Sequence, residues 1–232
     1  KMQKNMVRDV QTFFVEKTFF VHLEERSFQD ERLGRDKSLN MVITISRQHG
    51  CYGAETAIEL QKLLDQGWIV FHKEILEAIS KNSGVEQQYI EQFDEKTLPF
   101  IDTIVSGFNK PYLSDTSYLN HLRKFLISLS ERGKVIIVGR GANFVLKQGF
   151  HVRLIAPKAI RLKNLMDMNN YSRNEAEKEI EESDKHRRNY IKKMFDAEVD
   201  DPNNYDLVIN MKDLNYKETA RLIYDATQIS AI

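Results

Sequence analysis

Five short apolar runs, rich in β-branched residues, recur along the chain and are separated by segments with helical spacing. The runs are MVITI, WIVF, KVIIV, HVRLI and DLVIN, which begin at positions 41, 68, 134, 151 and 206. A strand covered on both faces is apolar throughout, and parallel strands need long crossovers that usually contain a helix. The order of the runs therefore predicts an α/β fold, with three α/β/α layers around a five-stranded parallel sheet.

Apolar residues at helical spacing fill the gaps between these runs. The predicted helices cover about 57–64, 158–168, a long segment that opens at Ser172, and about 216–229. Ser172 followed by Glu175 fits the capping box, in which each side chain satisfies a backbone donor of the first helical turn. No strand pattern interrupts residues 73–132, so we expect a helical insert between the second and third strands.

Residues 1–40 differ from the rest and are predicted to form an N-terminal helical extension with a polar connector. Val7, Val10 and Phe14 recur there at roughly helical spacing. An apolar helix face needs a partner, either the main domain or a second subunit, so the extension is a candidate homodimer contact. Residues 41–232 are long enough to form one α/β domain.

Composition excludes several classes of function. Lys+Arg and Asp+Glu both total 34, which gives no support to a whole-molecule nucleic-acid binder. Cys51 is the single cysteine, which excludes an intrachain disulfide and a Cys-rich zinc site. No apolar run approaches the roughly 20 residues of a membrane helix. We therefore expect a cytoplasmic protein without a membrane partner.

The stretch SRQHGCYGAET, residues 46–56, joins the first predicted strand to the first helix. A glycine-permitted turn there would point its backbone N–H groups, with the helix N-terminus, at an anion. The candidate ligand-binding residues are Ser46, Gly50, Cys51, Tyr52, Gly53, Ala54, Glu55 and Thr56. The complete P-loop pattern is absent, because Ala54 occupies the position of its lysine. In isolation, an ordinary strand-to-helix turn explains the stretch better.

A second glycine-rich turn, VGRGANF at residues 138–144, follows the third predicted strand. Ligands of open parallel sheets bind beyond the carboxyl ends of the strands, where this turn is expected to lie. Arg140 stands there between two glycines, and its planar donor fork suits a phosphate. The alternative is an arginine paired with a carboxylate of the core.

The third stretch, DKHRRNYIKK at residues 184–193, lies on the long predicted helix. Arg187, Arg188 and Lys192 would form a basic surface that closes on a polyphosphate. The acidic sequence immediately upstream could instead supply intrahelical partners and leave a solvated charged face. Arg161, on the preceding helix, has the same two interpretations.

In this order, the stretches resemble the cytidylate kinase-like family, a branch of the P-loop nucleoside monophosphate kinases. The matching pieces run from about Met41 to Ala226 and include ITISRQHGCYGAETA, VIIVGRGANFVL and DPNNYDLVINMKDL. The resemblance implies a P-loop NTPase-like sheet with the strand order 2-3-1-4-5. It also implies that the helical insert, about residues 73–132, holds the acceptor nucleotide and that about residues 172–196 form a lid.

The first loop of that family typically resembles SRxYGSGGRE. This chain keeps Ser46, Arg47, Gly50, Gly53 and Glu55. It departs at Cys51, at Tyr52, where a glycine is usual, and at Ala54, where an arginine is usual. His72 replaces the aspartate that commonly follows the second strand.

The resemblance implies γ-phosphoryl transfer from ATP, with Mg²⁺, to a nucleoside monophosphate, a reaction that depends on positioning and charge neutralisation. The implied catalytic residues are Arg47 in place of the missing lysine, Arg140 on the acceptor phosphate, and Arg187 with Arg188 from the lid. Ser46 or Thr56 would supply a hydroxyl near Mg²⁺, and Asn210 and Asp213 are candidates for contact with the donor base.

Two rival functions stay open. The first is a nucleotide-binding sensor or assembly protein of the same fold without transfer activity, which Ala54 favours and the retained Arg140 and Arg187 oppose. The second is a nucleic-acid-binding protein that uses the basic helix. The neutral net charge and the lack of an aromatic stacking pattern near that helix count against it.

Overall fold

The computed structural model of the chain describes residues 41–72, 116–139 and 141–230. The predicted N-terminal helix with its dimer contact, residues 73–115 of the predicted insert, and Arg140 lie outside these described residues. The division of the chain at residue 40 and the extent of the insert therefore stay predictions.

All five apolar runs of the sequence are strands, and together they form one parallel sheet in the order β2-β3-β1-β4-β5. The strands are β1 (Val42–Arg47), β2 (Ile69–Phe71), β3 (Val135–Val138), β4 (Phe150–Ile155) and β5 (Leu207–Asn210). At the centre, Ile43 of β1 lies opposite Ile136 of β3 and Phe150 of β4. The predicted α/β fold and its strand order are confirmed.

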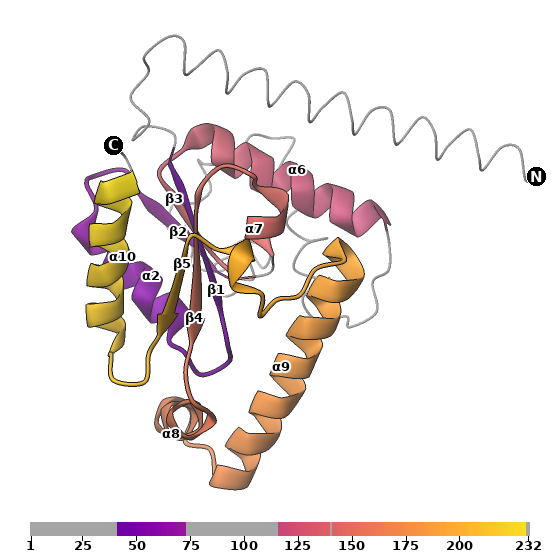
Figure 1. Cartoon of the computed structure of the whole chain (residues 1–232), viewed down its shortest axis with the longest axis vertical. Coiled ribbons are helices and arrows are strands. Elements are labelled where there is room, and N and C mark those ends of the chain that lie inside the picture. The colour runs from indigo at the N-terminus through magenta and orange to yellow at the C-terminus, as the bar shows by residue number, and fades with distance from the viewer. Residues whose placement is uncertain (1–40, 73–115, 140, 231–232) are drawn as a thin grey trace, which may run out of the picture. The chain divides into compact units, whose positions relative to one another are not determined.

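Helices cover both faces of this sheet. They are α2 (Gly53–Leu63), α6 (Thr116–Arg132), α7 (Ala142–Val145), α8 (Lys158–Asn169), α9 (Arg173–Phe195) and α10 (Tyr216–Ser230), with a 3₁₀ turn at Pro202–Asn204. Figure 1 shows α2 and α10 packed together on one face and α6 with α7 on the other. Sequence periodicity missed α7, because four residues are too few to produce a helical repeat. None of the described helices is both long and apolar enough to cross a membrane.

The main core lies between the sheet and these helices. Ile43, Ile45 and Leu154 are completely buried in it, as are Leu60 of α2 and Ile223 of α10. Burial on both faces of the central strands explains why their sequences are apolar without alternation. Each large side chain buried in this way contributes roughly 1.5–3 kcal/mol to the free energy of unfolding.

A separate small cluster joins α8 to α9 beyond the carboxyl edge of the sheet. Its buried members are Leu162 and Leu165 of α8 and Ala176 and Ile180 of α9. The N-terminal half of α9 is therefore attached to α8, and Figure 1 shows the helix running from there back past the sheet edge. This attachment positions the polar face of α9 over the loops at the ends of the strands.

The predicted capping box at the start of α9 is present. The backbone N–H of Glu175 donates to the Ser172 hydroxyl, and the Glu175 carboxylate accepts from the Ser172 backbone N–H at 2.8 Å.

We expect Ser172→Ala to lower the free energy of unfolding by about 1 kcal/mol in urea titrations, because it leaves helix donors unpaired. Ser172→Asn keeps a capping oxygen and should stay close to the wild type. Equal losses in the two variants would contradict this account.

Candidate functional site

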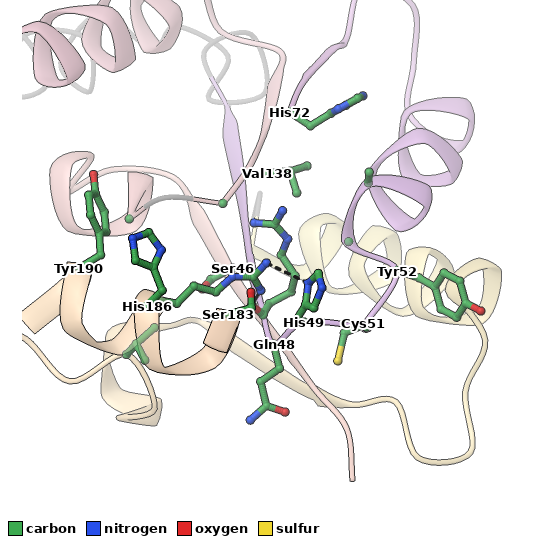
Figure 2. Close-up of a pocket in the computed structure, with 18 of the residues that line it drawn as sticks. Ser46, Gln48, His49, Cys51, Tyr52, His72, Val138, Ser183, His186 and Tyr190 are labelled. Carbon is green, nitrogen blue, oxygen red and sulfur yellow. Dashed lines mark hydrogen bonds between the residues drawn. The ribbon is translucent and has the colours of Figure 1, made fainter. Parts of the chain in front are cut away.

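A cavity of about 610 Å³ lies at the carboxyl ends of the strands. Its lining includes the loop after β1 (Ser46, Arg47, Gln48, His49, Gly50, Cys51, Tyr52, Gly53, Ala54 and Glu55), the ends of β2 and β3, and parts of α6, α8 and α9. Figure 2 shows His186 and Tyr190 of α9 on one side of this loop and Tyr52 turned away on the other. The structure thus brings most of the predicted phosphate loop to one cavity.

The first turn of α2 presents backbone donors to this cavity. The first helical hydrogen bond of α2 runs from the Thr56 N–H to the Tyr52 carbonyl, and Tyr52, the N-cap residue, supplies no side-chain cap. The preceding N–H groups of a helix have no intrahelical acceptor. Gly53, Ala54 and Glu55 carry them and line the cavity. Such a helix end, with its partial positive charge, is suited to an anion.

Arg47 adds a cation at the same place. A Cβ built on Gly139, in the loop after β3, would lie 2.1 Å from Nη1 of Arg47, and one on Gly53 would lie 3.0 Å from its Cδ. Gly139 also has a φ of +94°, a conformation that glycine adopts without steric cost. The arginine side chain therefore runs between two glycines, from β1 across to the end of β3. This packing explains Gly53 and Gly139, one glycine from each of the two sequence motifs.

Arg187 of α9 meets the loop from the opposite side. Its Nη1 donates to the Arg47 carbonyl at 2.7 Å, and its Nη2 lies 3.4 Å from Nδ1 of His49. Figure 2 marks the contact with His49 as a dashed line. Arg188 is exposed and does not line the cavity, because adjacent residues of a helix point about 100° apart. The cavity face of α9 therefore carries Arg187 and not the wider basic surface that the sequence suggested.

His49 is held neutral by this environment. Its pKa is lowered from 6.5 to about 4, mainly by burial and also by the positive charges of Arg187 and Arg47, against the opposing effect of Asp184. Its Nε2 lies 3.4 Å from a carboxylate oxygen of Glu179. A neutral imidazole that donates from Nε2 to Glu179 can accept at Nδ1 from Arg187, so both contacts are compatible with one tautomer.

Arg161 has a structural role instead of a place in the cavity lining. Its Nη1 donates to Asp184 of α9 at 2.6 Å, and its Nε donates to the Ala156 carbonyl at 3.1 Å. The other carboxylate oxygen of Asp184 accepts from the His49 backbone N–H at 3.4 Å. A Cβ on Gly50 would lie 2.8 Å from the Arg161 carbonyl oxygen, so α8 packs directly on the loop. Arg161 and Asp184 together join the loop, α8 and α9.

Arg153, in the middle of β4, was missed by the sequence motifs. Only 5% of it is exposed, and it lines the cavity. Its Nη1 donates to the Ser46 hydroxyl oxygen at 2.9 Å, and its Nη2 donates to Asp200 at 2.7 Å. A charged residue inside the otherwise apolar run HVRLI was the sequence signal that could have identified it, because buried arginines require partners.

Several predicted site residues lie elsewhere. Thr56 is completely buried, and its hydroxyl donates to the Tyr52 carbonyl at 2.7 Å. Asn210 and Asp213 are exposed and outside the cavity lining, and Asn210 accepts from the Lys212 N–H. Cys51 does line the cavity, but it also belongs to the main core, and burial raises the pKa of its thiol to about 11. Arg140 lies outside the described residues, although its neighbours Gly139 and Gly141 both line the cavity.

The described residues contain no group of three or more His, Cys, Asp or Glu side chains that could hold a metal ion. Magnesium, however, is commonly bound by one or two protein oxygens together with substrate phosphates. Ser46 and Glu55 place a hydroxyl and a carboxylate on the cavity wall. This donor set fits an ion that arrives with a nucleotide and does not form a complete site for an ion alone.

The chain is similar to known proteins in sequence and in fold. The model of the cytidylate kinase-like family matches residues 42–213. A solved structure of an uncharacterized protein from Eubacterium ventriosum has 19% sequence identity and a TM-score of 0.61, covering 82% of this chain and 99% of that chain. Shikimate kinase from Bacteroides thetaiotaomicron has 12% identity and a TM-score of 0.47, covering 81% and 98% of the two chains. No curated protein matches the sequence.

The depressed pKa of His49 predicts a stability loss in acid. The folded-state pKa of about 4 lies below the unfolded value of 6.5, so the unfolded state binds the proton first as the pH falls. The stabilising contribution is complete above pH 6.5 and is lost toward pH 4. We expect His49→Gln to lose less stability than the wild type over this window in urea titrations. If NMR titration of the folded protein gives His49 a midpoint near pH 6.5, the lowered folded-state pKa is contradicted.

Proposed function

Because the chain belongs to the cytidylate kinase-like family, we propose that it transfers the γ-phosphate of ATP to a nucleoside monophosphate. Membership rests on the family match over residues 42–213. It supports a kinase acting on a nucleotide or another small molecule. The proposal goes further by naming the donor and the class of acceptor.

The observation that carries the proposal is the position of Arg47 at the N-terminus of α2. Its side chain packs between Gly53 and Gly139, beside backbone donors that have no intrahelical acceptor. A cation, a helix end and a cavity in one place form a binding site for a polyphosphate. Arg47 would supply the positive charge that Ala54 lacks.

The chemistry would depend on positioning and charge neutralisation, since phosphoryl transfer needs no protein nucleophile. The loop amides would hold the donor phosphates, and Arg47 would neutralise their charge from the side of β3. Arg187 would neutralise the transferred group from α9. Magnesium, when bound with the nucleotide, would stabilise negative charge on the phosphate oxygens. Ser46, oriented by Arg153, and Glu55 would be its protein ligands.

The acceptor would occupy the end of the cavity near β2. Phe71 and His72 at the end of β2, with Leu122 and Phe125 of α6, line that end. The predicted acceptor insert continues from this part of the chain, and the predicted acceptor arginine, Arg140, follows the neighbouring strand β3. The apolar wall supports an acceptor with a planar ring more than a small polar one.

A binding protein without transfer activity is the rival. Arg187 donates to the Arg47 carbonyl and contacts His49, so two of its five N–H donors already have protein partners, which favours the rival. A coupled assay with Mg-ATP and a panel of nucleoside monophosphates, run beside calorimetry with ATP, separates the two functions. ATP binding without turnover for any acceptor would favour the rival. Absence of nucleotide binding would overturn both.

Substitution of Arg47 or Arg187 should change the turnover number. Arg47→Ala and Arg187→Ala should each lower the turnover number by about 10³-fold, the lower end of what one arginine contributes in phosphoryl transfer. Arg188→Ala serves as the matched comparison on the same helix, since Arg188 is exposed outside the cavity lining. It should reduce turnover far less than Arg187→Ala. Equal effects at the two positions would argue against the role of Arg187 and in favour of a general basic surface.

A further inference from the structure

Tyr52 has a backbone conformation that its side chain disfavours. Its φ is 43° and its ψ 42°, in the left-handed region, where bulky residues are rare and glycine is free of strain. Glycine is also the usual residue at this position in the resembled loop. An asparagine or a glycine would satisfy the backbone here without an aromatic ring. The presence of a tyrosine in this disfavoured conformation therefore points to a role for its ring.

The ring lies where the phosphate loop meets two other elements. Its centroid is 5.8 Å from that of Tyr216, at the start of α10, with an interplanar angle of 49°. Asp167, near the end of α8, is close enough to raise the pKa of the Tyr52 hydroxyl, after the larger effect of burial. Both tyrosines are half-buried. Figure 2 shows the ring projecting from the loop away from His49 and His72.

The cavity lining on this side includes part of α8. Met168 and Asn169, from the last turn of α8, line the cavity together with Tyr52. In the chain α8 follows β4, which lies on the opposite side of β1 from β3 and β2. The cavity lining therefore includes residues that follow strands on both sides of β1.

We propose that the ring of Tyr52, supported by Tyr216, is the stacking surface for the base of the donor nucleotide. The inference rests on the proposed function, which assigns the loop to the donor phosphates and the β2 side to the acceptor. A base attached to those phosphates then extends toward α8 and α10, where Tyr52 is the aromatic residue on the cavity wall. Stacking uses the face of any base, so this surface recognises a nucleobase as a class.

The contact also replaces the sequence expectation for the donor base. Asn210 and Asp213 follow β5 on the same side of the sheet but are outside the cavity lining. Tyr216 follows them in the chain and reaches the loop through its ring contact with Tyr52. The segment after β5 would thus act on the base by supporting Tyr52.

The test compares a nucleotide with a ligand that has no base. Calorimetry would measure binding of Mg-ATP and of magnesium tripolyphosphate to the full chain and to Tyr52→Gly, Tyr52→Asn and Tyr52→Phe. Loss of one stacking contact should weaken ATP binding by roughly ten-fold in the Gly and Asn variants. Their tripolyphosphate affinity should fall less than their ATP affinity, because only ATP loses the stacking contact, and Tyr52→Phe should stay closest to the wild type for both ligands. Gly and Asn both tolerate positive φ, so two ringless variants are available if one fails to fold.

The results distinguish failure of the stacking role of Tyr52 from failure of the proposed function. Equal weakening of ATP and tripolyphosphate binding, or no weakening of ATP binding, would overturn the stacking role, while binding of both ligands by the wild type would still support the proposed phosphate site. A lower melting temperature with unchanged ATP affinity would assign the ring to packing against Tyr216 alone. Failure of the wild type to bind either ligand would overturn the proposed function together with the inference.

Discussion

The side chain of Arg47 can cross from β1 to the end of β3 only because Gly53 and Gly139 lack a Cβ. At Gly139 that atom would lie 2.1 Å from the guanidinium. The arginine therefore depends on two turns that are far apart in the sequence and adjacent in the sheet. Its charge is placed beside the unpaired donors of α2, which form the positive end of that helix. Arg187 of α9 contacts Arg47 through the Arg47 carbonyl, and the charges of both arginines contribute, after burial, to the lowered pKa of His49.

α9 is the second element of that arrangement. Asp184 accepts from the loop backbone and from Arg161, while Arg187 donates to the Arg47 carbonyl and contacts His49. These polar contacts join α9 to the loop, and the apolar cluster with α8 holds its N-terminal half. The low pKa of His49 is caused first by burial, and the positive charges of Arg187 and Arg47 lower it as well. A polyphosphate in the cavity would reduce the positive potential of these two arginines, which is the electrostatic reason to expect one there.

The fold could be predicted in detail because its signals are local. An apolar run such as VIIV forms a strand when both faces are buried, and the capping box at Ser172 marks the start of α9 within four residues. The strand order 2-3-1-4-5 came from the resemblance and is confirmed. The site was harder to predict. Arg187 and Arg188 are adjacent in sequence, and only the direction of each side chain on the helix places the first in the cavity. The run around Arg153 indicates that it is buried, but its partners Ser46 and Asp200 come from distant parts of the chain and cannot be identified from that run.

The sequence by itself determined the alternation of strands and helices, and with it the edge at which the loops after β1 and β3 meet. Helical spacing, β-branched runs and turn glycines act over a few residues, so they can be recognised in the sequence without a structure. Only the tertiary structure decided which polar side chains share a space. Arg47 with Gly139, Arg161 with Asp184, and Tyr52 with Tyr216 are pairs from distant parts of the chain. Such pairs form because packing brings their backbones together, and no local pattern encodes that distance.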